Sequence, residues 1–514
     1  MKLKGNNLIV VNILTTYARM LLVVGMGLFS SRWVLMSLGK EDYGLYSVVG
    51  GLIGFIMFIG STMSSSIVRF FAYSIGKGDP DGIKRWFNTA FVSFSVFSIL
   101  LVILGVPMGH YLINNVMTIP PGRVQTCLWV YDLSVVGAVI TLLTVPYRGM
   151  LAAAQRMFEL SLWGMLGAVL SFFLAWYLLR ATGDLLLIFA TGAILIQLLI
   201  GLIQVVRAWW IFNACHLKCS YWFDKKQLKE LFSFVGWDLF GGMGYMVRNQ
   251  GTAFLINIFS GPTVNAAYGV ANQVSRHTTT ITGALLGAIA PEITAREGAG
   301  SRDRMISLSL RTSKFAILLT YLWLIPLFIE IDYVLELWLK TVPEYSGTFC
   351  RIVLLTFLFD TATQGFRSAV MATGNIKNFQ LTLGTILILT FPIVWLIYKI
   401  SGSPTLATGA VAVVAGIHSL GRVYWAKQLL NVPYSYWINS VLMKSLLILI
   451  PTLIVSLLLK YWMDSSFGFL ILLSAISFVT TCMSSWFFGL DETEKGFIRE
   501  KIERIILKVR TSKK

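Results

Sequence analysis

Charged residues are scarce in this chain. They make up 13% of its 514 residues, against about a quarter in an average soluble protein. Acidic residues are the scarcer kind, since 24 Asp and Glu face 42 Lys and Arg and the formal net charge is +18. This shortage excludes a soluble enzyme and a disordered chain. The basic residues interrupt long apolar runs instead of covering a wet folded face, so we expect no nucleic-acid partner and predict a polytopic membrane protein.

Cysteine is scarce as well, and five cysteines are too few for a disulfide framework. Cys215, His216 and Cys219 lie close together in the sequence. They supply only three ligands, and their spacing fits no standard zinc motif. We therefore expect neither a metal site nor a bound cofactor.

Long apolar runs are abundant, and mean hydropathy over the whole chain is +0.73. Because a spanning helix needs about 20 mostly apolar residues, the sequence predicts an all-α protein with fourteen transmembrane helices. Their expected limits are 8–38, 43–73, 84–110, 122–146, 152–179, 185–212, 229–258, 264–290, 308–331, 349–373, 378–399, 404–429, 437–460 and 466–488. The loops between them are short, so function must reside within or between the helices.

The two halves of the chain repeat weakly. The segment Tyr43–Val49 is similar to Tyr268–Val274, 225 residues later. This offset predicts that the first six spans are duplicated as the next six, which gives two lobes with a cavity between them. The expected division is an N-terminal lobe at 1–212, a cytoplasmic linker at 213–228, a C-terminal lobe at 229–430, two appended helices at 431–490 and a cytoplasmic tail at 491–514.

Lysine and arginine are unevenly divided among the loops. With a cytoplasmic N-terminus, the inside segments carry 29 of them and the outside loops six. Because cytoplasmic loops are enriched in these residues, we expect both termini in the cytoplasm. The tail has apolar residues at helical spacing and basic residues mostly off that face, so we expect an amphipathic helix on the anionic inner leaflet.

Several arginines fall inside the predicted spans, where each costs at least about 2.5–3.5 kcal/mol on insertion scales. Only three acids lie well inside spans, so the excess positive charge implies an anionic ligand. Arg19 is the deepest, about 16 Å into its span at 1.5 Å per residue. The candidate residues of a cationic cavity are Arg19, Arg248, Arg276, Arg69, Arg32, Asn12, Thr16 and Asn272. The three acids, Asp238, Asp360 and Asp132, are candidates for coupling transport to an ion gradient.

Four strings carry a family resemblance, namely Ser30–Leu35, Leu38–Tyr46, Arg69–Asp79 and Gly261–Gly269. Together with the pattern of six, six and two spans, they resemble the Wzx-type polysaccharide flippases of the multidrug/oligosaccharidyl-lipid/polysaccharide (MOP) exporter superfamily. Arg19 matches the arginine in the first span of the related lipid II flippases. Arg69 and Arg276 match by rough position.

The resemblance implies a transporter in the bacterial cytoplasmic membrane. It would move undecaprenyl-pyrophosphate-linked oligosaccharide units from the cytoplasmic to the periplasmic leaflet for O-antigen, capsule or exopolysaccharide synthesis. Alternating access of two lobes, driven by a proton or sodium gradient, is the implied mechanism. Membrane lipids, a polysaccharide polymerase and glycosyltransferases are the implied partners.

Two other transporters remain as alternatives. A lipid II flippase differs only in the substrate's headgroup. A MATE-like drug exporter would favour acidic cavity residues and usually ends at twelve spans, so the arginines and the two extra helices count against it. A membrane glycosyltransferase or polymerase would need catalytic carboxylates or a large outer loop, and the longest outer loop, 332–348, is too small.

Overall fold

The structure, a computed structural model, describes residues 6–51, 54–115, 117, 119–222, 224–339, 342–492, 494–496 and 499–500. These residues form helices joined by short connections, with no strand among them, which confirms the predicted all-α class. They divide into two compact units. Unit 1 comprises 1–240, 283–305 and 371–377, and unit 2 comprises 241–282, 306–370 and 378–514.

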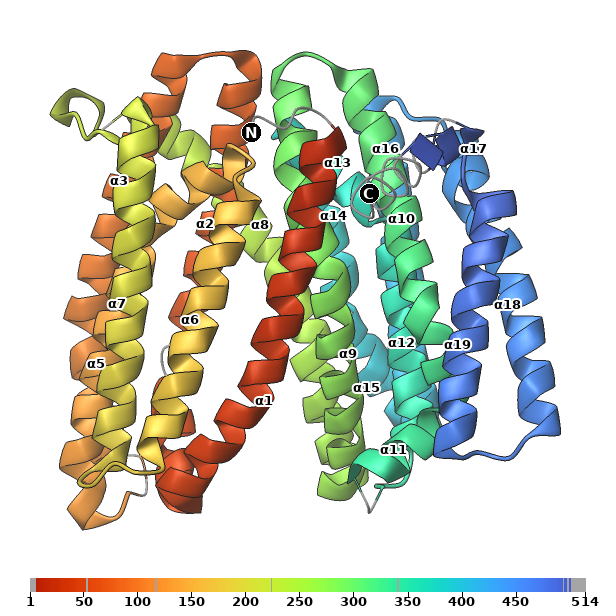
Figure 1. The fold of residues 1–514 in the computed structure, drawn as a ribbon, viewed down its shortest axis with the longest axis horizontal. Helices are drawn as coiled ribbons and strands as arrows, with labels where there is room; N and C mark the ends of the chain where they lie inside the picture. Colours follow the sequence, from red (N-terminus) through yellow and green to blue (C-terminus); the bar gives the residue numbers. More distant parts are fainter. Residues whose placement is uncertain are drawn as a thin grey trace, which may run out of the picture. The chain divides into compact units, whose positions relative to one another are not determined.

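Unit 1 is built mainly from the first seven long helices (Figure 1). The π-helical turn η1 (Leu101–Gly105) joins α3 to α4, so these two continue as one helix. The elements are α1 (Asn6–Gly51), α2 (Gly54–Lys77), α3 (Pro80–Leu100), α4 (Val106–Asn115), η2 (Pro121–Arg123), α5 (Val124–Ala153), α6 (Met157–Leu178), α7 (Leu185–Ile211), η3 (Asn213–Cys215), η4 (Cys219–Tyr221) and most of α8 (Lys225–Met246).

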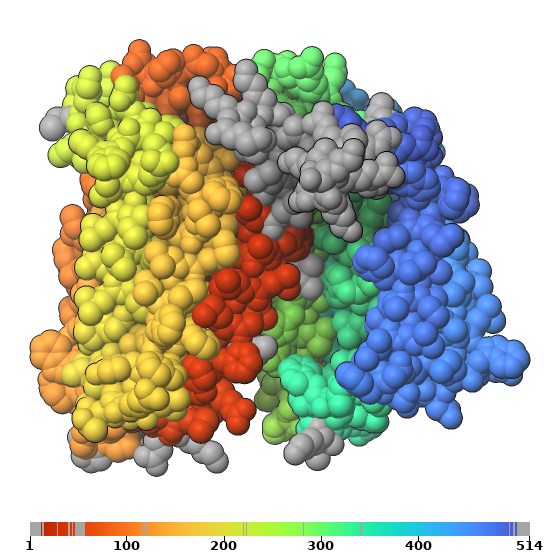
Figure 2. Space-filling model, in the orientation of Figure 1, coloured from red at the N-terminus to blue at the C-terminus, as the bar shows by residue number. Residues whose placement is uncertain are grey.

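Unit 2 begins near the end of α8 and includes all of the chain's last helices. Of these, α18 and α19 carry many exposed apolar side chains and form the blue surface in Figure 2. The elements are η5 (Val247–Gly251), α9 (Thr252–Gly298), α10 (Arg302–Ile329), α11 (Ile331–Leu339), α12 (Ser346–Ala362), α13 (Gln364–Thr373), α14 (Lys377–Ile388), α15 (Thr390–Ser401), α16 (Pro404–Leu430), α17 (Tyr434–Trp437), η6 (Ile438–Leu442), α18 (Met443–Trp462), α19 (Phe467–Ser484) and η7 (Ser485–Gly489).

Short polar residues start several of these helices. The Asp79 carboxylate accepts a hydrogen bond from the Gly82 backbone N–H at 2.8 Å, and Pro80 follows as the first helical residue of α3. Asp184 caps α7 in the same way through the Leu187 N–H at 3.3 Å. A capping oxygen satisfies a backbone donor that has no partner within the helix, and proline suits the first position because it lacks that donor.

The number of apolar helices is lower than the fourteen predicted spans. Ten helices of the described residues are long and apolar enough to cross a membrane, or eleven with the bent pair α12–α13 counted as one span. The described residues of the other three predicted spans, 43–73, 229–258 and 264–290, are helical too. Each of these three segments carries one arginine, Arg69, Arg248 and Arg276 respectively.

Two helix breaks support the predicted repeat. The backbone leaves helical geometry at Gly39 within α1 (φ 73°) and at Gly261 within α9 (φ 82°), 222 residues apart. Glycine adopts a positive φ without the steric cost that a side chain imposes. The starts of two later helices have the same spacing. α3 starts at Pro80 and α10 at Arg302, which are also 222 residues apart. The predicted lobe boundaries at 212 and 229 stay a prediction.

The predicted cytoplasmic tail starts with an acidic cluster. The buried Lys314 ammonium lies 2.6 Å from the Glu494 carboxylate and 3.4 Å from that of Asp491, which also pairs with Lys444. Burial alone would raise the pKa of the Asp491 carboxyl, but its hydrogen bond to Lys444 and the charge of Lys314 hold that pKa below its usual value. The tail's expected amphipathic face at 501–514 lies outside the described residues.

Glycine allows α2 and the end of α9 to touch backbone to backbone. A Cβ atom at Gly76 would lie 1.8 Å from the Ala295 carbonyl oxygen, and one at Gly298 would lie 2.1 Å from that of Tyr73. We predict that Gly76→Ala destabilises the protein by about 1–3 kcal/mol, as overpacking does. A thermal unfolding curve of the purified protein measures this. Gly236→Ala in α8 is the control, because no atom lies within 4 Å of its new Cβ. Equal unfolding temperatures for the two variants would contradict the prediction.

Candidate functional site

Unit 1 contains a cavity of about 510 Å³, which lies in the range of roughly 300–1,000 Å³ typical of small-molecule sites. Its walls come from α1, α5, α6, α7 and the 283–288 segment of α9. We call it the arginine cavity. Its polar lining consists of Thr16, Arg19, Thr141, Thr144, Arg148, Ser161, Ser171, Gln197 and Gln204.

Among the described residues, two cations line the arginine cavity, and no acid does. Within the described part of the chain, neither Arg19 nor Arg148 makes an ion pair or a hydrogen bond. Arg19 packs against α6 where Gly164 leaves room, since a Cβ there would lie 2.8 Å from Arg19 Cδ. Two unpaired guanidinium groups facing one cavity repel each other and attract an anion. Guanidinium suits phosphate oxygens because its planar fork can donate two parallel hydrogen bonds.

Arg148 was not among the residues predicted from the sequence. It falls outside the predicted fourth span, which ends at 146, whereas α5 continues to Ala153. Thr141, Thr144 and Arg148 follow one another at steps of three and four residues, which places them on one face of α5. This spacing is the signal that could have identified Arg148.

Two other residues predicted on α1 have different positions. Thr16 lines the arginine cavity, but Asn12 does not. The Asn12 amide donates a hydrogen bond to the Gln155 carbonyl oxygen at 3.1 Å, and the Gln155 amide donates in turn to the Glu292 carboxylate. Asn12 therefore holds the turn between α5 and α6. Arg32 is exposed on α1 and does not line the arginine cavity.

Arg69 also lies elsewhere in unit 1. Its Nε donates to the Met371 carbonyl at 3.1 Å and its Nη2 to that of Ala372 at 3.0 Å. The last carbonyls of a helix lack partners within it and attract cations, so Arg69 caps the end of α13. The same side chain lines a separate cavity of about 340 Å³, together with Lys77, Arg85 and the acids Asp79 and Glu230. The structure does not bring Arg69 into the arginine cavity.

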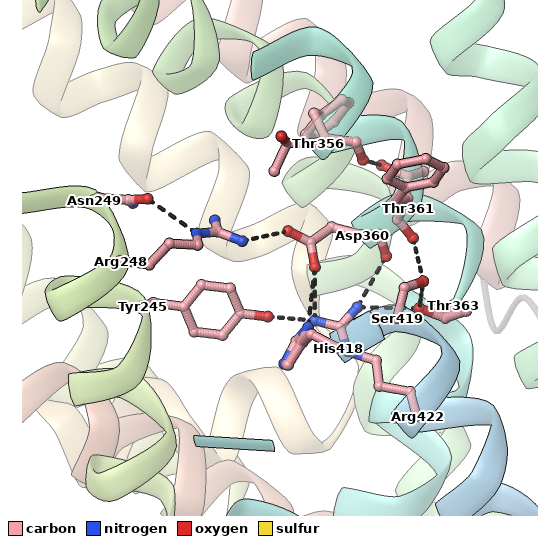
Figure 3. A network of polar contacts seen from close by, with 12 residues as sticks. Tyr245, Arg248, Asn249, Thr356, Asp360, Thr361, Thr363, His418, Ser419 and Arg422 are labelled. Carbon is pink, nitrogen blue, oxygen red and sulfur yellow. Dashed lines mark hydrogen bonds and ion pairs between the residues drawn. The ribbon is translucent and has the colours of Figure 1, made fainter. Parts of the chain in front are cut away.

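Unit 2 contains a buried charge network centred on Asp360 of α12 (Figure 3). The Asp360 carboxylate lies 3.4 Å from Arg248 of η5 and 3.1 Å from Arg422 of α16. His418 Nδ1 is 3.6 Å from the same carboxylate. Arg422 is only 1% exposed, donates to the Asp360 carbonyl oxygen at 3.0 Å and also contacts the Tyr245 hydroxyl. One acid thus neutralises one of two buried arginines, and a positive charge remains.

This network changes how two predicted residues are interpreted. Both carboxylate oxygens of Asp360 face cations, an arrangement that holds guanidinium groups rather than a sodium ion. Arg248 and Asn272 do lie together, since both line a small cavity of about 50 Å³ in unit 2. Arg276 is exposed on α9 and does not line that cavity. Arg422 falls within the predicted span 404–429 and is not among the predicted site residues, although its spacing of four from His418 within α16 could have identified the pair.

The other two acids occupy different surroundings. Asp132 of α5 pairs with His110 of α4 at 2.8 Å, and both side chains are about one third exposed. Asp238 is a buried residue of α8. Both remain candidates for ion coupling. No group of three or more His, Cys, Asp or Glu side chains suited to hold a metal ion occurs among the described residues.

Solved structures with the same fold are transporters. A multidrug resistance MATE family transporter of the MOP superfamily, in an outward-facing conformation, aligns with a TM-score of 0.69 and 12% identity over 82% of this chain and 95% of that one. A MOP superfamily transporter from Pyrococcus furiosus aligns with a TM-score of 0.68 and 13% identity over 84% and 99%. The chain therefore has the fold of the MATE transporters, and ten or eleven of its described helices are long and apolar enough to cross a membrane.

One named relative is similar in sequence. The uncharacterized membrane protein EpsK of Bacillus subtilis (strain 168) is 24% identical over 310 residues. The match spans 58% of this chain and 58% of the length of EpsK. No family model matches the chain.

Proposed function

We propose that this protein is a flippase for undecaprenyl-pyrophosphate-linked oligosaccharide units, which it moves from the cytoplasmic to the periplasmic leaflet of the bacterial cytoplasmic membrane. The products would feed O-antigen, capsule or exopolysaccharide synthesis. The observation that carries this proposal is the arginine cavity, with Arg19 and Arg148 unpaired and no acid in its lining. A pyrophosphate supplies the missing negative charge and several oxygens to accept hydrogen bonds from guanidinium.

The substrate's parts match the chemistry of the helices. The pyrophosphate binds at the arginines while the isoprenoid tail stays in the bilayer. Reorientation of the lobes then exposes the headgroup to the other side. A proton or sodium gradient drives this step, with Asp132 and Asp238 as coupling candidates. Glycosyltransferases act before this step, and a polymerase acts after it. Both termini lie in the cytoplasm.

A MATE-like drug exporter shares the fold but differs in the expected charge of its site. A cationic drug gains nothing from two unpaired arginines, which repel it. The Pyrococcus furiosus neighbour is described as a transporter whose reverse pocket polarity suggests a different function, so pocket charge differs among proteins with this fold. A lipid II flippase remains the second candidate, because lipid II carries the same pyrophosphate.

Binding by the purified protein in detergent micelles separates these functions. We expect an undecaprenyl-diphosphate-linked oligosaccharide to bind and inorganic pyrophosphate to compete with it, whereas a cationic dye should neither bind nor compete. Stronger binding of lipid II than of the oligosaccharide lipid would favour the second candidate. Binding of the dye without binding of either diphosphate would overturn the proposal.

A further inference from the structure

Two neutral polar side chains of the arginine cavity lack partners. Gln204 of α7 is only 6% exposed and Ser161 of α6 only 2%. Both line the cavity, and neither hydrogen-bonds to any other described residue. Roughly 90% or more of buried polar groups have a hydrogen-bond partner in protein or water. An amide and a hydroxyl that stay unpaired at the wall of a cavity are therefore available to a bound molecule.

Helix register places Gln204 at the same level as Arg148. The Gln197 amide donates to Thr141 of α5, and a Cβ at Gly201 would lie 3.0 Å from Thr144 Cγ2. These two contacts advance together along the chain, so α5 and α7 run in the same direction. Gln204 and Arg148 follow the second contact by three and four residues, which is about one turn of 5.4 Å along each helix.

Ser161 lies at the same end of the cavity, near Arg19. A Cβ at Gly167 of α6 would lie 3.6 Å from Ile200 of α7, and one at Gly192 of α7 would lie 2.5 Å from Leu174. These contacts show that α6 runs opposite to α7, so the start of α6 meets the end of α7. Ser161 is one turn before Gly164, against which Arg19 packs. The unpaired neutral groups and the unpaired cations therefore occupy one end of the arginine cavity.

We infer that Gln204 and Ser161 form a sugar subsite that recognises the first sugar attached to the diphosphate. This inference rests on the proposed function. A sugar hydroxyl both donates and accepts hydrogen bonds, as do a carboxamide and a serine hydroxyl. In a sugar 1-diphosphate the ring is joined directly to the phosphate. A ligand of that class places its hydroxyl or acetamido groups beside the anion, as the cavity places its neutral groups beside the arginines.

The part of the cavity wall that α9 contributes leaves space for a ring. It includes Gly283 and Gly287 of α9, and no atom lies within 4 Å of a Cβ built at either glycine. The cavity's other glutamine is less available, because the Gln197 amide nitrogen already donates to the Gly137 carbonyl at 2.5 Å and to Thr141. Gln204 is therefore the glutamine with free hydrogen-bonding groups at the charged end.

Affinity for two lipids that differ only in the sugar tests this subsite. The full-length protein is titrated with undecaprenyl diphosphate and with undecaprenyl-diphosphate-linked N-acetylhexosamine. We expect Gln204→Leu and Ser161→Ala each to weaken binding of the sugar-bearing lipid by about tenfold, the equivalent of one lost hydrogen bond. Binding of the sugar-free lipid should stay unchanged. Thr191→Val is the control, since this exposed residue of α7 bonds only to its own helix.

A soluble UDP-linked N-acetylhexosamine separates the sugar diphosphate from the lipid, and its binding should weaken in the same two variants. Equal weakening of both lipids by Gln204→Leu and Ser161→Ala, or no weakening of either, overturns the sugar subsite. Arg19→Ala should weaken both lipids alike. If Arg19→Ala weakens neither, the proposed function fails, whatever the Gln204 and Ser161 variants do. If the two variants lose binding of the sugar-bearing lipid but keep binding of the sugar-free lipid, the result supports the subsite. A variant that folds poorly would instead lose binding of both lipids, and the other variant then decides.

Discussion

Replacing Arg19 by alanine is expected to abolish export of surface polysaccharide while the amount of protein in the membrane stays normal. The Arg19 guanidinium has no acidic partner among the described residues, so its loss leaves no buried carboxylate uncompensated. What is lost is half of the positive charge of the arginine cavity. The charge-assisted hydrogen bonds to an anion, each worth about 1.5–3 kcal/mol, go with it. Polysaccharide on the cell surface and an immunoblot of the membrane fraction measure the two effects.

Arg19→Lys separates charge from geometry. Lysine keeps the positive charge but has no planar fork. We expect this variant to export at least tenfold less than the wild type if two parallel hydrogen bonds to phosphate are needed. Arg180→Ala removes an exposed arginine that stacks on Trp176 beyond the end of α6, and it should export normally. Normal export by Arg19→Ala would contradict the proposal that the arginine cavity binds the exported substrate.

Replacing Asp360 by asparagine is expected to be the most destabilising single change in unit 2. Asp360 is the only acid among the described residues that pairs with both Arg248 and Arg422, and both arginines are buried. Breaking a buried ion pair by removing one partner costs about 3–5 kcal/mol, because the remaining charge stays buried without compensation. Thermal unfolding of the purified protein and its yield from membranes measure this loss. Asp464→Asn, at an exposed acid, is the control.

A second substitution tests whether charge is the cause. Adding Arg422→Met to Asp360→Asn removes the more deeply buried uncompensated cation and replaces it with an apolar side chain of similar length. We expect the double variant to be more stable than Asp360→Asn alone, since residues of one network show coupling energies of about 0.5–3 kcal/mol. A double variant that unfolds at a lower temperature than the single one would show that hydrogen-bond geometry, and not charge, holds the network.

The fold class could be predicted because hydropathy depends on local composition. Long apolar runs predict helices, and the 222-residue interval between Gly39 and Gly261 lies within three residues of the 225-residue offset between the similar segments of the sequence. The predicted spans 43–73, 229–258 and 264–290 are helical over their described residues, but they are not among the helices that are long and apolar enough to cross a membrane. The position of Arg19 at a cavity wall could be predicted, because its depth within a single span is read directly from the sequence.

The remaining site residues depend on long-range contacts that no local pattern encodes. Arg69 donates to carbonyls about 300 residues away, and Asp360 joins two arginines from different helices. Arg148 lies just beyond the predicted span 122–146 and Arg422 near the end of the span 404–429, where basic residues usually mark the cytoplasmic side. Their helical spacing to Thr144 and His418 was visible, but which faces of α5 and α16 are buried follows only from packing.

Transport by the purified protein in lipid vesicles shows whether the arginine cavity carries a diphosphate-linked oligosaccharide across the bilayer. Vesicles loaded with an undecaprenyl-diphosphate-linked oligosaccharide would be probed for the appearance of the sugar on the opposite leaflet, with the wild type, Arg19→Ala, the Arg19→Ala/Arg148→Ala double variant and Arg180→Ala. We expect transport by the wild type and by Arg180→Ala, and none above protein-free vesicles by the two cavity variants. Transport by the double variant at the wild-type rate would contradict this expectation.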